Sequence, residues 1–330
     1  MKKTTIAEWL IFIVCAATFL ITAMYSDRFV PTSFGKETFK SSVIEPRDTM
    51  YGAAKVGDRF VWIVGQNGKI VQSVDGGKIW KNLDSGIIRH LQDIAAWDER
   101  RLVAVGNDGV VIISRDGGDS WAKVEAPKSK VANKLIRVKT FYGGKAWTCG
   151  VMGTALSTND YGATWVRRIP EQDVAYNDIA FATPDIGVIV CEFGEIKRTE
   201  DGGDTWAQVK SPVESSLEAV CFNGGGIGIA VGLGGVILRS ADYGKTWTRI
   251  QDVETSEHLW DIIYSQNRWI CVGSKGVISS SLDKGIDWNV RQLSKNDMLW
   301  HTEIVPLSSK LIIVGGTQGV YKNNQWSYLF

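Results

Sequence analysis

The chain lacks an excess of either charge, since its 330 residues hold 37 Lys and Arg against 36 Asp and Glu. It therefore shows neither the basic excess typical of nucleic-acid binding nor an acidic tail. Only five cysteines occur and no two form a CxxC pair, so a zinc site is not indicated and we predict neither a metal nor a cofactor. Proline is scarce, whereas 35 Gly and 14 Trp indicate many tight turns and a Trp repeated for one structural reason.

The first 25 residues read as a membrane segment, because Ile6 to Tyr25 contain one charge, Glu8. Twenty helical residues span about 30 Å, the thickness of a bilayer core. Lys2 and Lys3 place the N-terminus in the cytoplasm. We therefore predict a cytoplasmic N-terminus at 1–5, an uncleaved signal-anchor helix at 6–25, a stalk at 26–47 and a periplasmic or exterior domain. A cleaved signal peptide remains the alternative, although the run ends in a poor small-x-small site.

An octet recurs through the rest of the chain and closes each time on Trp. The spacings between successive Trp residues are 41, 44, 41, 41, 41 and 38 if a degenerate copy ending at Trp326 is included. A G-x-x-G turn precedes almost every octet, and the segments between the turns are short and β-branched. The six octets are SVDGGKIW (73–80), SRDGGDSW (114–121), TNDYGATW (158–165), TEDGGDTW (199–206), SADYGKTW (240–247) and SLDKGIDW (281–288).

Each unit of about 40 residues reads as four short strands with no room for an ordinary helix. Four-stranded units of this length indicate propeller blades. The sequence therefore predicts an all-β, seven-bladed β-propeller over residues 48–330, with antiparallel blades. FGKETF at 34–39 echoes the octets, so the stalk is a candidate source of a ring-closing strand near 37–43.

The octets themselves are expected to be structural. Their invariant Gly suggests a left-handed backbone, their Asp can accept bonds from amides of its own turn, and their Trp can anchor neighbouring blades. Six near-identical copies also argue against catalysis, because an active site needs different residues that converge. The Asp and Trp positions are Asp75, Asp116, Asp160, Asp201, Asp242, Asp283, Trp80, Trp121, Trp165, Trp206, Trp247 and Trp288.

The pattern S/T-x-D-x-G-x-T/S-W resembles the Asp-box, also called the BNR repeat, over about residues 48–330. Among Asp-box propellers, the chain looks most like the photosystem II assembly and stability factor family, which shares the seven blades, the period near 41 and the G-x-x-G turns. That resemblance implies an exported, non-enzymatic protein that contacts a client. Sialidases carry the same box, but the RRIP at 167–170 follows the third octet, whereas their F/Y-R-I-P motif precedes the first.

A binding face is predicted where the innermost strands begin, because charged residues, all three His and two Trp gather there. Two interpretations stay open: these groups bond strand-edge amides, or they recognise a protein segment. A metal site is a third, less favoured because the His residues come from separate blades. The candidates are His90, Asp93, Arg137, Asp178, His258, Trp260, Asp261, Trp300, His301 and Glu303.

The sequence thus favours a non-enzymatic, membrane-anchored propeller that docks on a membrane or envelope protein and assists assembly or stability of a complex. The alternative is an exported carbohydrate-active hydrolase or lectin of the sialidase-like type. No nucleic-acid partner is expected.

Overall fold

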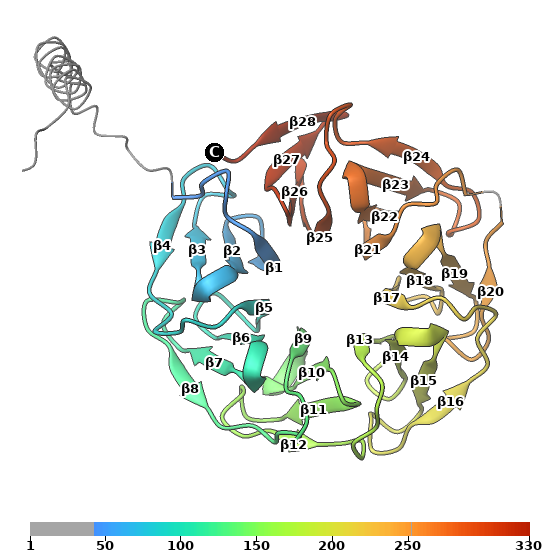
Figure 1. The fold of residues 1–330 in the computed structure, drawn as a ribbon, viewed down its shortest axis with the longest axis horizontal. Helices are drawn as coiled ribbons and strands as arrows, with labels where there is room; N and C mark the ends of the chain where they lie inside the picture. The colour runs from blue at the N-terminus through green and yellow to red at the C-terminus, as the bar shows by residue number, and fades with distance from the viewer. Residues whose placement is uncertain (1–42, 252) are drawn as a thin grey trace, which may run out of the picture. The chain divides into compact units, whose positions relative to one another are not determined.

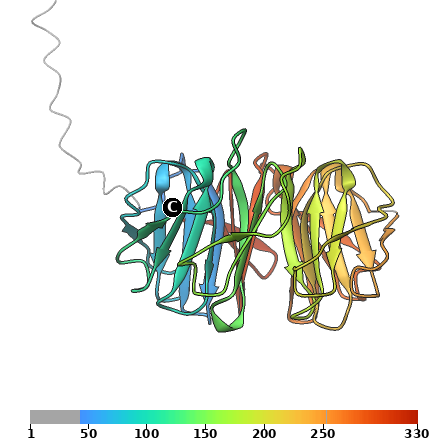
Figure 2. The same ribbon diagram turned by 90° about the horizontal axis from the view of Figure 1, so that it is seen from below.

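The computed structural model describes residues 43–251 and 253–330. Seven antiparallel sheets, each of four consecutive strands, form a closed ring (Figure 1). Residues of their first strands line a central channel. The predicted seven-bladed propeller is therefore confirmed. Seen from the side, the sheets stand upright around the ring (Figure 2).

Blades 1 to 4 follow one another in chain order. Blade 1 holds β1 (Met50–Val56), β2 (Phe60–Gly65), β3 (Ile70–Ser73) and β4 (Lys81–Leu83); blade 2 holds β5 (Leu91–Ala96), β6 (Leu102–Gly106), β7 (Val111–Ser114) and β8 (Ala122–Val124); blade 3 holds β9 (Leu135–Thr140), β10 (Ala146–Gly150), β11 (Thr154–Thr158) and β12 (Val166–Arg167); blade 4 holds β13 (Tyr176–Phe181), β14 (Gly187–Cys191), β15 (Ile196–Thr199) and β16 (Ala207–Val209).

Blades 5 to 7 complete the ring. Blade 5 holds β17 (Leu217–Phe222), β18 (Gly228–Gly232), β19 (Ile237–Ser240) and β20 (Thr248–Arg249); blade 6 holds β21 (Leu259–Ser265), β22 (Arg268–Gly273), β23 (Val277–Ser281) and β24 (Asn289–Gln292); blade 7 holds β25 (His301–Leu307), β26 (Lys310–Gly315), β27 (Gly319–Lys322) and β28 (Gln325–Tyr328). One-turn 3-10 helices link the second and third strands of blades 1 to 6: η1 (Gln66–Gly68), η2 (Asn107–Gly109), η3 (Tyr142–Gly144), η4 (Glu192–Gly194), η5 (Leu233–Gly235) and η6 (Ser274–Gly276).

Strand direction gives the ring two distinct faces. The first strand of each blade lines the channel, and its starting end defines what we call the upper face. The connections between blades and the G-x-x-G turns lie on this face, because the four strands of a blade alternate in direction. The octet turns join the third and fourth strands and lie on the opposite, lower face.

The octets are hydrogen-bonded turns inserted between blades. In the first octet, Asp75 Oδ1 accepts the N–H groups of Lys78 and Ile79, each at 3.0 Å, while Ser73 Oγ accepts Gly77 N–H at 2.8 Å. Gly77 has a φ of 79°, in the left-handed region that a side chain would strain. Its missing Cβ would lie 2.8 Å from Ile312 of blade 7, so the turn also needs Gly for close packing.

The core lies in the seven seams between blades. Each octet Trp packs against the blade before it, as Trp165 of blade 3 does against Val103 and Ile113 of blade 2. At the closing seam, Ile44, Met50 and Val61 pack with Val305 and Ile312 of the last blade.

Blade 7 obtains all four of its strands from residues 301–328, so the ring closes by packing between complete blades. The predicted strand near 37–43 lies outside the described residues except for Val43, which is in a bend. The predicted anchor at 6–25 also lies outside them. Within residues 43–251 and 253–330, no helix is long and apolar enough to cross a membrane.

Candidate functional site

Three of the predicted acidic residues join neighbouring blades inside the channel. Asp93, Asp178 and Asp261 directly follow a bulge near the start of the first strand of blades 2, 4 and 6. Their Oδ2 atoms accept the backbone N–H of the next blade, from Val138 (2.8 Å), Val220 (3.0 Å) and Ile304 (2.8 Å). The innermost strands have an unpaired edge toward the channel, and a buried N–H there is costly without a partner. The three carboxylates therefore act as staples between inner strands.

A buried ion pair crosses the channel at the level of these staples. Arg137 of blade 3 lies 2.7 Å from the Glu303 carboxylate of blade 7. Its Nη2 also donates to the carbonyls of Trp260 (3.1 Å) and Thr302 (3.0 Å). Both side chains of the pair are nearly inaccessible, at 7% and 10% exposure. Arg137 thus closes the channel by binding backbone and carboxylate on its far side.

Burial governs the titration of this cluster. It raises the pKa of Asp93 to about 6, although Arg137 and Lys139 pull in the opposite direction. Burial likewise raises the pKa of Asp261 and Glu303. Burial opposes the charge of Arg137, but the surrounding carboxylates outweigh it and raise the Arg137 pKa. These groups form hydrogen bonds and ion pairs with one another and with the backbone.

The three histidines do not converge. His90 Nδ1 accepts the N–H of Asn67, and His258 Nδ1 accepts the N–H of Gly234, both at 3.0 Å. Each therefore holds the G-x-x-G turn of the preceding blade. His301 is fully buried, with Nε2 2.9 Å from Asp297. Among the described residues, no group of three His, Cys, Asp or Glu is placed to hold a metal.

Aromatic rings gather on the upper face where the ring closes. Tyr51 stacks on Trp300, with ring centroids 6.0 Å apart and planes 7° from parallel. Tyr51 also meets the edge of His90 at 6.0 Å. Burial raises the pKa of Tyr51, so its hydroxyl stays neutral. Trp260 lies beside His258, with ring centroids 5.8 Å apart, and donates from Nε1 to Ser274 Oγ at 3.0 Å.

Exposed aliphatic side chains flank the stacked rings in sequence. Ile88 precedes His90 in the connection to blade 2 and is 79% exposed. Met298 and Leu299 precede Trp300 in the connection to blade 7 and are 66% and 44% exposed. Exposed apolar groups beside aromatic rings are typical of protein-binding surfaces. We call this set the rim patch: Tyr51, Ile88, His90, Met298, Leu299 and Trp300.

Sequence reasoning missed four members of the rim patch. A signal for Tyr51 was present, because it follows the first inner-strand residue Met50 just as Trp260 follows Leu259. Ile88, Met298 and Leu299 lie in irregular connections, where no period marks a residue as exposed. The predicted face therefore divides into buried staples and this partly exposed patch.

Comparison with known proteins identifies the family of the chain. The model of the family described as photosynthesis system II assembly factor YCF48 matches residues 79–173 and 167–252, more than half of the chain. The chain belongs to this family. YCF48 proteins are also among the solved structures similar to it, whereas none of the curated proteins matches.

Three solved structures show the shared fold. A structure described as YCF48 bound to D1 peptide is 20% identical, with a TM-score of 0.68, and the match covers 82% of this chain and 91% of that one. YCF48 from Cyanidioschyzon merolae is 14% identical, with a TM-score of 0.66 and coverage of 83% and 94%. The WD40 propeller domain of Doa1 is 12% identical, with a TM-score of 0.64 and coverage of 82% and 90%. At these identities the likeness concerns the fold.

Proposed function

We propose that this protein is a non-enzymatic assembly factor that docks on a segment of a membrane or envelope protein. The observation that carries the proposal is the rim patch, where Tyr51 stacks on Trp300 and exposed Ile88, Met298 and Leu299 lie within two residues of His90 or Trp300 in the chain. Rigid aromatic rings provide contact area at a low entropic cost, and exposed apolar side chains add to it. Family membership supports an assembly role, and the related YCF48 described as bound to D1 peptide supports a polypeptide as ligand.

The proposal includes a membrane anchor at residues 6–25, with the propeller in the periplasm or exterior. The apolar run and the two preceding lysines support it. Tethering would raise the local concentration of the propeller near a membrane client. A protease added to intact spheroplasts should digest the propeller while the N-terminus stays protected; digestion only after lysis would refute this topology.

Photocrosslinking in the native host tests the docking face. A photoreactive amino acid at position 88 or 299 should capture one defined membrane or envelope protein. The matched control is position 79, since Ile79 is 74% exposed on the lower face and Ile88 is 79% exposed on the upper face. Capture of the same protein from position 79 but not from 88 or 299 would overturn the face assignment.

The alternative of a sugar hydrolase or lectin makes a different prediction. It requires a free carboxylate pair or sugar-binding groups at the channel mouth, and Asp93, Asp178 and Asp261 bond backbone amides instead. Release or binding of a glycan that is lost on changing these residues would favour the alternative over docking.

A further inference from the structure

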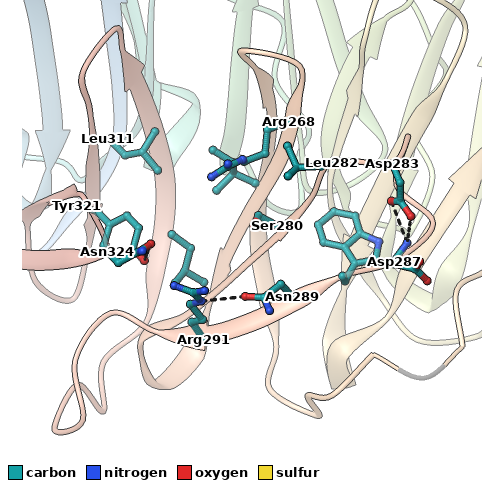
Figure 3. Close-up of a pocket in the computed structure, with 13 residues that line it drawn as sticks. Arg268, Ser280, Leu282, Asp283, Asp287, Asn289, Arg291, Leu311, Tyr321 and Asn324 are labelled. Carbon is teal, nitrogen blue, oxygen red and sulfur yellow. Dashed lines mark hydrogen bonds between the residues drawn. The ribbon is translucent and has the colours of Figure 1, made fainter.

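A cleft of about 600 Å³ separates blades 6 and 7. Arg268, Ser280 and Arg291 lie on the blade 6 side, and Leu311 and Tyr321 on the blade 7 side (Figure 3). The cleft extends to the turns that follow β23 and β27, on the lower face and remote in the fold from the rim patch.

At the other seams, an octet turn of the following blade occupies the corresponding space. Its Gly packs directly on the preceding blade, as Gly118 does on Leu83, Gly203 on Trp147 and Gly285 on Ile229. Polar side chains of the preceding blade then bind the turn. Arg198 Nε donates to Tyr243 O at 2.9 Å, and Arg239 Nε donates to Lys284 O at 2.8 Å.

Blade 7 has no such turn. Tyr321 pairs with Leu311 as the octet residue Ser73 pairs with Val61, so Tyr321 stands at the octet Ser position. Tyr321 pairs directly with Trp326, and the hairpin turns through Asn323 and Asn324, with φ of 51° and 61°. Six residues from Tyr321 to Trp326 replace eight from Ser73 to Trp80. The shorter hairpin leaves the seam open.

Arg268 occupies the position from which an arginine of another blade contacts an octet. It lies five residues before Gly273 at the end of β22, as Arg101 lies five residues before Gly106 at the end of β6. The Arg101 guanidinium lies 3.8 Å over the ring of Tyr161, in the octet of blade 3. Arg268 is exposed and, within residues 43–251 and 253–330, makes no side-chain hydrogen bond or ion pair.

Arg291 occupies the position from which an arginine of another blade pairs with a carboxylate of an octet. It follows Trp288 by three residues, as Arg168 follows Trp165. Arg168 forms an ion pair at 3.2 Å with Asp204, in the octet of blade 4. Arg291 is exposed and bonds only Asn289, at 2.9 Å, within the described part of the chain. Both arginines thus face a space that the repeat would fill with a Tyr and an Asp.

We propose that this cleft is a vacant turn socket that binds a partner protein through a Gly-containing turn. The turn carries an aromatic residue before its Gly, which stacks on Arg268, and a carboxylate after it, which pairs with Arg291. Buried Ile270 and Ile278 form the apolar floor. Asp283 and Asp287 also border the cleft, and Asp283 accepts hydrogen bonds within its own octet. The carboxylate of the partner therefore binds on the Arg291 side, away from both.

A short peptide tests the socket on the full-length protein. The probe is a fluorescent peptide with the sequence of residues 199–206, TEDGGDTW, in which Tyr replaces Gly202, so that Tyr and the Asp204 carboxylate flank the Gly. Arg268→Glu and Arg291→Glu should each weaken binding about tenfold or more, as loss of a charged contact does. Arg249→Glu is the matched control, because Arg249 is exposed and lies outside the cleft.

Three results distinguish occupation of the socket from binding of the probe elsewhere on the protein. A probe with Asn in place of Asp204 should bind Arg291→Glu and the wild type equally weakly. Trp300→Ala should leave probe binding unchanged, so a failed rim patch does not affect this outcome. The thermal unfolding midpoint of each variant should equal that of the wild type, which shows that the fold is retained.

Other occupants would overturn the proposal. If the probe binds only after residues 33–39 are replaced by Gly and Ser, the socket belongs to the chain's own octet-like segment. Sedimentation showing self-association that Arg268→Glu abolishes would assign it to a second copy. If the probe binds neither the wild type nor the variant with residues 33–39 replaced, the cleft does not have the proposed role.

Discussion

Arg137 and Glu303 lie in blades 3 and 7, 166 positions apart in the chain, and form a buried ion pair across the channel at 2.7 Å. The pair fixes the distance between opposite sides of the ring. Because Arg137 also binds two backbone carbonyls, it connects blade 3 with both blade 6 and blade 7. At this level the channel interior is thus a structural element of the ring.

Removal of one partner of this pair should destabilise the ring strongly. Glu303→Gln removes the carboxylate that contacts the buried Arg137 guanidinium at 2.7 Å and leaves only more distant carboxylates such as Asp93 and Asp261, so we expect the free energy of unfolding to fall by about 3 kcal/mol. Urea denaturation followed by Trp fluorescence measures it. The double variant Arg137→Met/Glu303→Leu should not recover the loss, since buried Asp93 and Asp261 then lose the cation that offsets their burial. A single variant as stable as the wild type would contradict the role of the pair.

The carboxylate staples can be tested at Asp93. Asp93→Ala leaves the N–H groups of Ile94 and Val138 without acceptors in a buried setting. We expect a loss of about 2–4 kcal/mol in the free energy of unfolding. Asp119→Ala is the control, because Asp119 forms an exposed pair with Lys81 and should change stability by under about 1 kcal/mol. Equal effects of the two changes would refute the staple.

Replacement of an octet Gly should destabilise the protein for two separable reasons, backbone strain and a clash with the preceding blade. Gly244→Ala forces a side chain into a left-handed backbone (φ 77°) and places its Cβ 2.6 Å from Val188 of blade 4. Gly57→Ala has the same backbone strain (φ 58°) in open space. The Gly57 variant should lose about 1–2 kcal/mol, and the Gly244 variant about 1–3 kcal/mol more. Thermal unfolding midpoints in the reverse order would exclude insertion of the octet into the preceding blade.

The octet Asp residues predict a loss of stability in acid. Hydrogen bonds from Ser120, together with Ser114, lower the pKa of Asp116 to about 2, against about 3.9 in an unfolded chain. Its contribution is therefore fully present above about pH 4 and is lost as pH falls toward 2. Because Asp116 is exposed, we expect under about 1 kcal/mol from it alone.

The measurement compares wild type with Asp116→Asn by urea denaturation from pH 6 to pH 2.5. The stability difference between them should shrink as the pH falls. Asp93 acts with the opposite sign, because its raised pKa of about 6 removes stability as pH rises from about 4 to 6. That contribution is common to both proteins and cancels in the difference. A difference that grows in acid would contradict the lowered pKa of Asp116.

The sequence by itself determined the fold because the fold is a repetition of local chemistry. An octet with Ser or Thr, Asp, Gly and Trp forms its own turn, and strands of β-branched residues recur at a fixed period, so the number of blades and their boundaries could be read along the chain. The absence of the turn before Trp326 was visible in the same way.

Only the tertiary structure decided what the other residues do. Asp93 and Arg137 hold equivalent places in their blades, yet one bonds the next blade and the other reaches across the channel, because closure of the ring sets which strand lies opposite. Tyr51 meets Trp300 only because the first blade adjoins the last. The cleft beside Arg268 and Arg291 likewise arises from a turn missing in the neighbouring blade, and such contacts between distant segments leave no period in the sequence.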